Sequence, residues 1–244
     1  MRAVKTVGFD TATDDTVVAG LDGDRVVAER TIAPGDSGRP LHSQTLLQAA
    51  GEAADALGGW GEVDRIAVGL GPGTFTGIRI GIATAGGLSL STGVPAVGVS
   101  TLAALAMTIS RESGADGPVM PVLDARRGEV FAGLYNHAGR ELEPPFVGSP
   151  DDLAARIREF AARLPRPPLV GGPGAVRFAG ELDRAGIDTP GLATTPHRLS
   201  GRAICELGAG AARSQPGKPL EPIYLRVPDA QLWLQRDGRD PGPD

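Results

Sequence analysis

Residues 71–79 read Gly-Pro-Gly-Thr-Phe-Thr-Gly-Ile-Arg and join a short apolar run, 64–70, to a long stretch with helical periodicity, 76–91. Glycines at such a junction permit positive φ values and the close approach of another backbone or a ligand. The expected helix also carries small residues at every fourth position, in one stripe along its side. They are Gly73, Gly77, Gly81, Ala85 and Ser89. Because each glycine inside a helix costs about 1 kcal/mol relative to alanine, the stripe indicates a packing requirement.

The small-residue stripe has two interpretations that the residues alone leave open. The helix either packs tightly against its own sheet, or it presents the stripe to another subunit. A third use, phosphate binding at the helix start, is chemically feasible because loop amides there attract anions. The segment is not a nucleoside-triphosphatase P-loop, however, because no lysine follows Gly77 and Arg79 lies two positions further on.

The order of elements predicts a two-lobed α/β protein in which each lobe is a mixed sheet flanked by helices. Three strand-like runs open the chain, and alternating helices and strands follow as far as residue 109. A similar order begins again at residue 118. The predicted organisation is a first lobe over 1–100, joined by a helix at about 197–214, a second lobe over 101–196, a C-terminal segment over 215–235 and a disordered tail over 236–244.

Composition narrows the function classes. A hydrophobic content of 41% with 22% charged residues is ordinary for a globular protein. A net charge of −5 does not support nucleic-acid binding through bulk electrostatics. The single cysteine, Cys205, excludes an intramolecular disulfide and a multi-cysteine metal site. We find no signal-peptide pattern and no apolar stretch long enough for a bilayer, so we expect a cytoplasmic protein.

Several short motifs, in order along the chain, resemble those of the TsaB (YeaZ-type) family. They lie at 8–12, 42–44, 69–79, 98–102, 124–131 and 222–226. The segment 69–79 is highly specific, whereas the others are individually modest. This family belongs to the actin-like, Hsp70-like and sugar-kinase-like ATPase superfamily, so the resemblance implies that two-lobed fold. TsaB in turn is similar to its catalytic partner, TsaD.

Two departures from catalytic relatives are informative. TsaD-type proteins carry a pair of metal-binding histidines where this chain has Thr101 and Leu105. Nucleotide-binding members of the superfamily place a glycine pair where this chain has Ala125, Arg126 and Arg127. No metal site of the TsaD kind is therefore expected, and catalytic ATP hydrolysis is not favoured. The two arginines either attract an anion or form a solvated turn in which one of them pairs with the nearby acid at position 129.

The resemblance implies a non-catalytic scaffold or dimerisation subunit. It would bind and support TsaD, which transfers a threonylcarbamoyl group to N6 of adenosine 37 in tRNAs that read ANN codons. The implied partners are TsaD, in a heterodimer, and the ATPase TsaE, and a homodimer is left open. The chain would meet tRNA only through the complex, and no membrane is implied. No cofactor is required by the chain itself, and ATP or ADP at the subunit interface is left open.

Two sets of residues are candidate sites. The candidates for nucleotide binding are Asp10, Thr11, Gly71 and Gly73. The candidates for the partner interface, on the helices at 42–57 and 76–91, are His42, Leu46, Thr76, Gly77, Arg79, Gly81 and Ala85. Asp10 also has a purely structural interpretation as the cap of a strand end, and His42 has one as a core residue.

Two other function classes stay open at this point. One is a self-sufficient enzyme, either an actin-like nucleotide-dependent kinase or a metallopeptidase, and the two departures argue against both forms. The other is a binding module that holds a nucleotide at a subunit interface. Metal analysis, an ATPase assay and calorimetry distinguish these classes.

Overall fold

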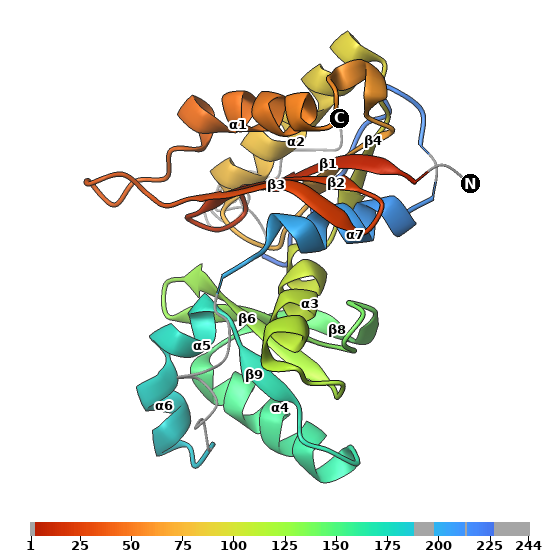
Figure 1. Ribbon diagram of the computed structural model, residues 1–244. Helices are drawn as coiled ribbons and strands as arrows, with labels where there is room; N and C mark the ends of the chain where they lie inside the picture. Colours follow the sequence, from red (N-terminus) through yellow and green to blue (C-terminus); the bar gives the residue numbers. More distant parts are fainter. Residues whose placement is uncertain (1–2, 188–197, 213, 227–244) are drawn as a thin grey trace, which may run out of the picture.

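The computed structural model describes residues 3–187, 198–212 and 214–226. The chain folds into two lobes, each built on one mixed sheet with helices packed against it (Figure 1). This is the architecture that the order of elements predicts. The tail predicted at 236–244 lies outside the described residues. Within the described ranges, no helix is both long enough and apolar enough to cross a membrane.

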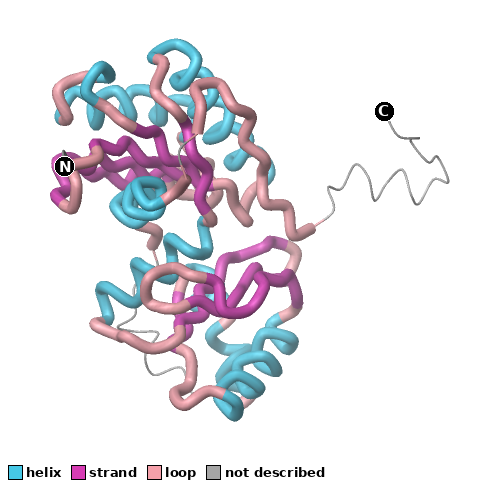
Figure 2. The backbone as a smooth tube through the Cα atoms, turned by 90° about the vertical axis from the view of Figure 1, so that its right-hand side faces the viewer, coloured by secondary structure: helices cyan, strands magenta, loops and turns pink. Residues whose placement is uncertain are grey.

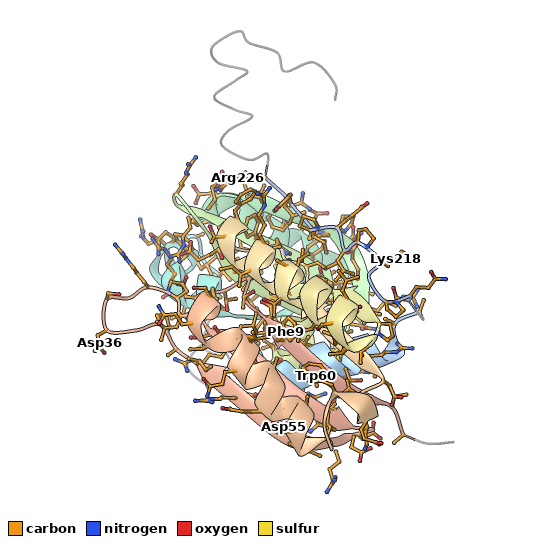
Figure 3. All side chains as sticks on the ribbon, turned by 90° about the horizontal axis from the view of Figure 1, so that it is seen from above. Phe9, Asp36, Asp55, Trp60, Lys218 and Arg226 are labelled. Atoms are coloured by element: carbon orange, nitrogen blue, oxygen red, sulfur yellow. The ribbon has the colours of Figure 1, made fainter. Side chains whose placement is uncertain are left out.

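The first lobe contains a five-stranded sheet in the order β3-β2-β1-β4-β5. Its elements are β1 (Lys5–Asp10), β2 (Thr16–Asp22), β3 (Arg25–Ile32), α1 (His42–Ala56), η1 (Trp60–Glu62), β4 (Arg65–Gly69), α2 (Phe75–Thr92) and β5 (Ala96–Val99). β1, β4 and β5 are parallel, whereas β1, β2 and β3 form an antiparallel meander. α1 and α2 lie side by side over one face of this sheet, as Figure 3 shows from above.

The second lobe contains a four-stranded sheet in the order β8-β7-β6-β9. Its elements are α3 (Thr101–Ser113), β6 (Val119–Arg126), β7 (Glu129–Tyr135), β8 (Glu141–Gly148), α4 (Pro150–Arg163), β9 (Leu169–Gly171), α5 (Pro173–Arg177) and α6 (Ala179–Arg184). The chain then returns to the first lobe through α7 (Gly201–Gly210). The tube in Figure 2 shows the two sheets as separate layers, one in each lobe.

Alternation along each strand explains why both faces of the first sheet are covered. In β1, Val7 and Phe9 point toward α1 and α2 and are fully buried. The intervening Gly8 faces α7, where a Cβ would lie 2.6 Å from the sulfur of Cys205. The missing side chain at Gly8 therefore sets how closely α7 approaches the sheet.

α3 and α7 form the layer between the two sheets. Leu102 and Leu105 of α3 share one buried cluster with Ala203 and Ile204 of α7, and residues of both sheets complete it. Figure 1 shows α7 against the first sheet and α3 against the second. The lobes therefore meet over a continuous apolar core, and this core sets the base of the cleft between them.

One helix differs from its expected form. The periodicity predicts a single helix at 175–184, whereas the structure has two short helices that meet at Phe178. Phe178 has φ −105° and ψ 20°, outside the helical region, and its side chain is buried in the core of the second lobe. Tertiary packing of one aromatic side chain therefore takes precedence over helical periodicity here.

Candidate functional site

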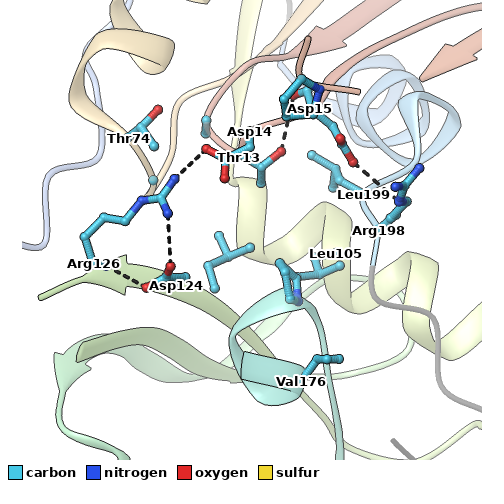
Figure 4. Close-up of a pocket in the computed structure, with 15 residues that line it drawn as sticks. Thr13, Asp14, Asp15, Thr74, Leu105, Asp124, Arg126, Val176, Arg198 and Leu199 are labelled. Atoms are coloured by element: carbon cyan, nitrogen blue, oxygen red, sulfur yellow. Dashed lines mark hydrogen bonds and ion pairs between the residues drawn. The ribbon is translucent and has the colours of Figure 1, made fainter. Parts of the chain in front are cut away.

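The carboxyl ends of the parallel strands meet at a cleft between the lobes. The loops after β1 and β4 approach it from the first lobe, and the ends of β6 and β9 approach it from the second. The cleft has a volume of about 420 Å³ (Figure 4). Apolar side chains line part of it, including Leu105, Leu123, Val176 and Leu199. Ligands of α/β proteins usually bind at this edge of the strands, so the cleft is a candidate binding site.

Ion pairs cross the mouth of the cleft. Arg126 Nη2 in the second lobe lies 2.6 Å from Oδ1 of Asp14 in the first lobe. Arg126 Nη1 also lies 3.3 Å from Oδ2 of Asp124, and Arg177 Nη1 lies 3.0 Å from the same oxygen. Figure 4 shows the Arg126 guanidinium held between the two carboxylates. Because Arg126 is about half exposed, the pairs contribute at most about 1 kcal/mol each to stability.

Arg126 ends β6 and Arg127 begins the turn to β7, and both have positive φ values, 63° and 55°. Such a conformation costs a non-glycine residue about 1–2 kcal/mol. The Arg126 amide donates to Oδ1 of Asp124 at 2.8 Å, so this amide is already occupied and does not point freely at a phosphate. Of the two arginines considered as partners of Glu129, Arg126 pairs instead with Asp14 and Asp124, and pairing of Arg127 with Glu129 stays a prediction.

Asp10 ends β1 and has no exposed surface. Its Oδ2 accepts a hydrogen bond from Thr101 Oγ1 at 2.6 Å, and its Oδ1 accepts one from the Ala12 amide at 2.6 Å. Burial raises the pKa of Asp10 to about 6, although both hydrogen bonds act in the opposite direction. The nucleotide-binding role predicted for Asp10 is therefore corrected: the carboxyl group caps the strand end and ties it to the start of α3.

The other predicted nucleotide-binding residues fall into two groups. Thr11 is buried and its Oγ1 donates to the Gly77 carbonyl oxygen at 2.7 Å, so it faces α2 and is not available to a ligand. Gly71 is also buried, and its amide donates to Thr101 Oγ1 at 3.2 Å. Both predictions are wrong for this reason. Gly73 does line the cleft, so its predicted role stays a prediction.

The positions that carry histidines in TsaD-type proteins have no ligand chemistry here. Thr101 donates its hydroxyl to Asp10, and Leu105 contributes an apolar side chain to the cleft. Among the residues that the structure describes, no group of three or more His, Cys, Asp or Glu side chains is arranged to hold a metal ion.

The outer surface of α1 and α2 is a second candidate site. On α2, the exposed residues that face away from the sheet are Phe75, Thr76, Arg79, Ala83, Gly87 and Leu90. Leu90 is 74% exposed, and Leu47 on α1 is 64% exposed. We call the six residues of α2 together with Leu47 the outer helical face. Arg79 is the one charged residue among the seven. Exposed apolar side chains along one side of a helix are candidates for a protein contact surface.

The small-residue stripe lies on the opposite side of α2 and packs inside the chain. A Cβ at Gly77 would overlap the carbonyl oxygen of Thr11. A Cβ at Gly81 would lie 2.7 Å from Thr11 Oγ1 and 3.4 Å from Val68. Ala85 is fully buried in the same contact with the sheet. Of the two interpretations of the stripe, packing against its own sheet is therefore the one observed.

This packing corrects part of the predicted interface. Gly77, Gly81, Ala85 and Leu46 are buried within the chain, so they are wrong as surface contacts for a partner. Thr76 and Arg79 are exposed on the outer helical face, and their role stays a prediction.

His42 is a core residue at the start of α1. It is 4% exposed, and its Nδ1 lies 2.7 Å from Thr16 Oγ1. Burial lowers the pKa of His42, opposed by a hydrogen bond to the Thr13 backbone and by the charges of Asp14 and Asp15. His42 thus packs beneath the loop after β1 that forms the rim of the cleft. Its predicted place in a partner interface is wrong.

Known proteins with the same fold identify the family. A family model described as TsaD, tRNA N6-adenosine threonylcarbamoyltransferase, matches residues 29–165. The solved structure of YeaZ from Pseudomonas aeruginosa is 30% identical, covers 83% of this chain and 90% of its own, and has a TM-score of 0.66. The chain belongs to the TsaB (YeaZ-type) family.

Two further relatives support the TsaB assignment. A second Pseudomonas aeruginosa structure, described as similar to the peptidase YeaZ, is 28% identical with a TM-score of 0.70 over 91% of this chain and 100% of that chain. Escherichia coli TsaB, described as a tRNA threonylcarbamoyladenosine biosynthesis protein, is 35% identical over 54% of this chain and 55% of its own length. The matched segment spans 55%, 42% and 34% of the lengths of the relatives from Escherichia coli, Mycobacterium leprae and Bacillus subtilis. The predicted two-lobed α/β fold is confirmed, because these YeaZ-type structures share it.

Sequence reasoning missed the acids at the rim of the cleft. Asp14 and Asp15 follow β1, and Asp124 lies near the end of β6, so all three stand at carboxyl ends of central strands. That position was a usable signal, because parallel strands place such residues along one edge. The partner of Asp15, Arg198 at 3.6 Å, comes from a distant segment and had no local signal.

Proposed function

We propose that this TsaB-family chain is a non-catalytic subunit of the machinery that forms threonylcarbamoyladenosine in tRNA, and that it binds and supports a TsaD-type transferase. The outer helical face is the observation that carries the proposal. Its exposed small and apolar residues run along α2, and Leu47 adds one exposed apolar side chain from the neighbouring α1. Small side chains such as Ala83 and Gly87 allow the helices of a partner to pack at short interaxial distance.

The chemistry of the cleft supports a non-catalytic role. A general base or a metal ligand at this edge would need an available carboxylate or imidazole. Asp14 and Asp124 are paired with Arg126 instead, and Asp10 is buried. Leu105 adds an apolar side chain where catalytic relatives need a ligand.

The proposal also covers the further partners, the homodimer, the nucleotide and the cellular compartment. The ATPase TsaE and the tRNA join through the complex with TsaD. A homodimer through the same outer helical face competes with the heterodimer. The proposal requires no cofactor in this chain itself, and it leaves open ATP or ADP at the subunit interface. The compartment is the cytoplasm.

Reconstitution tests the proposal. TsaD and TsaE modify tRNA in the presence of this chain, and the threonylcarbamoyladenosine formed is measured by mass spectrometry of tRNA digests. We expect modification to depend on this chain. The variant Ala83→Arg places a bulky charge in the centre of the outer helical face, and burial of an unpaired charge should weaken binding to TsaD about 30-fold or more.

The matched control is Ala161→Arg, which makes the same change at an exposed position of α4 in the other lobe. It should bind TsaD and support modification like the wild type. Modification that proceeds equally well without the chain contradicts the subunit role. Full association of folded Ala83→Arg with TsaD contradicts the assigned surface alone.

The cleft favours one alternative, a module that binds a nucleotide. Its volume of about 420 Å³ lies in the range of small-molecule sites. Calorimetry with ADP, with and without TsaD, distinguishes the two functions. Tight binding to the isolated chain supports the module, and turnover of ATP by the isolated chain would instead indicate an enzyme.

A further inference from the structure

The segment 214–226 runs along α2 from its end toward its start. The Gly217 amide donates to Ser89 Oγ at 3.1 Å, near the C-terminal end of α2. Leu220 packs into the core beneath the helix. The Ile223 amide donates to the Leu70 carbonyl oxygen at 2.8 Å, just before the helix begins. Figure 3 labels Lys218 and Arg226 in this segment, on the side of α2 that is away from α1.

An aromatic cluster closes the segment onto the start of α2. The rings of Tyr224 and Phe75 are stacked, with centroids 5.4 Å apart. The guanidinium carbon of Arg79 lies 3.9 Å from the centroid of Phe75. Arg79 Nε also donates to the Tyr224 hydroxyl at 3.2 Å. Phe75 and Arg79 belong to the outer helical face, so Tyr224 is anchored to residues that solvent reaches.

The two residues after Tyr224 reach the other lobe. Leu225 packs against the apolar cluster between the lobes. Arg226 Nη1 donates to the Ala125 carbonyl oxygen at 3.0 Å, and its Nη2 forms an ion pair with Glu129. Ala125 and Glu129 flank the turn between β6 and β7.

That turn is the one that carries Arg126 to the mouth of the cleft. Its two arginines hold positive φ values that side chains disfavour, so the turn needs external contacts to keep its conformation. Arg226, in the segment along α2, donates a hydrogen bond to the Ala125 carbonyl oxygen beside the turn. Asp14, in the loop after β1, forms an ion pair with Arg126. Arg226 is only two residues from Tyr224, which belongs to the aromatic cluster.

We infer that Tyr224, Leu225 and Arg226 form a clasp that couples the exposed start of α2 to the turn between β6 and β7, and thereby to the position of Arg126 at the cleft. Tyr224 is a positioning residue, which acts on the turn through Arg226. If a partner docks on the outer helical face, which rests on the proposed function, its contact with Phe75 or Arg79 is transmitted to the cleft by this route.

Hydrogen–deuterium exchange on the isolated full chain tests the clasp without any partner, so its outcome is independent of the proposed function. The readout is a peptide that spans 124–130. Tyr224→Ala should speed its exchange on the order of tenfold, although Tyr224 does not contact the turn. Arg226→Gln should have a similar effect. The double variant should exchange no faster than Arg226→Gln alone, because both changes break the same connection.

Leu142→Ala is the control, since it trims a 45% exposed side chain on β8 of the same sheet. It should leave the exchange of 124–130 unchanged. The clasp is overturned by unchanged exchange in Tyr224→Ala, or by effects of Tyr224→Ala and Arg226→Gln that multiply in the double variant. If Tyr224→Ala does not fold, Arg79→Gln replaces it: this change should speed exchange of 124–130 about two- to threefold, and no change overturns the clasp.

Discussion

The two sides of α2 use the same kinds of residue for different purposes. On the inner side, Gly77 and Gly81 are small because the backbone and side chain of Thr11 occupy the space that a Cβ would take. On the outer side, Ala83 and Gly87 are exposed, and a Cβ at Gly87 would meet no atom within 4 Å. The inner glycines are therefore required by the fold. The residues that the structure describes impose no such requirement on Gly87.

This contrast shows why a small-residue pattern is ambiguous in a sequence. Close packing on one side of a helix and an open surface on the other both produce glycine and alanine at short intervals. Gly87 costs helix stability, and no described part of the chain needs the space that a Cβ would take there. It therefore supports the proposal that the outer helical face meets another molecule.

The largest expected effect comes from filling the inner side. Gly77→Leu forces a side chain into the carbonyl oxygen of Thr11, where neither backbone can yield without moving β1. We expect a loss of more than about 3 kcal/mol in the free energy of unfolding, measured by urea denaturation.

Gly87→Leu is the outer counterpart of this variant. It should remain folded, with a free energy of unfolding within about 1 kcal/mol of the wild type, and lose association with TsaD. Equal destabilisation by the two substitutions would break the distinction between the inner and outer sides of α2.

A second effect concerns Asp10, which lies beneath the inner side. Its native pKa of about 6 is above the ordinary value of 3.8 for an aspartic acid, so the folded state binds the proton more tightly than the unfolded chain. This contribution to stability is present in full below about pH 4 and is lost as the pH rises through 6. Relative to Asp10→Asn, which imitates the protonated acid, the wild type should lose up to about 3 kcal/mol between pH 4 and 7.

Urea denaturation of both proteins across this pH range measures the difference. Asp14→Asn, a change at a 44% exposed acid on the neighbouring loop, is the control and should not remove the pH dependence. A difference between wild type and Asp10→Asn that is constant with pH would show that burial does not govern the titration of Asp10.

The smallest expected effect sharpens the outer side of the comparison. Gly87→Ala adds a methyl group to open space and improves helix propensity, so it should raise the free energy of unfolding by about 0.5–1 kcal/mol. Chemical denaturation detects this gain. A loss of stability would mean that Gly87 is packed and that the outer side resembles the inner one.

Local residue patterns were sufficient to predict most of the helices and strands. Asp22-Gly23 is a dipeptide typical of tight hairpin turns, and it joins β2 to β3. Ser100, a residue type that favours the cap position, stands before α3. In the structure Ser100 is the cap, and its side chain accepts a hydrogen bond from the Ala103 amide. These features depend on residues within a few positions of one another, so the sequence displays them directly.

Contacts between residues far apart in the sequence decided which side chains of the candidate site are available to a ligand. Asp10 and Thr11 stand at the end of the first strand, where the family resemblance implies nucleotide-binding residues, yet Thr101 and Gly77 satisfy their polar atoms from other elements. A linear pattern records where a polar residue occurs in the chain. It does not record which distant group will satisfy that residue once burial removes water.

The sequence by itself determined the α/β class, the two-lobed order of elements and the family, because these follow from periodicity, turn residues and the specific segment 69–79. Only the tertiary structure decided which side of α2 is buried and which acid meets Arg126. The physical reason is the same for both. Steric fit and desolvation act between surfaces that the fold brings together. Residues 71–79 therefore indicate tight packing, but they do not indicate which surface they pack against.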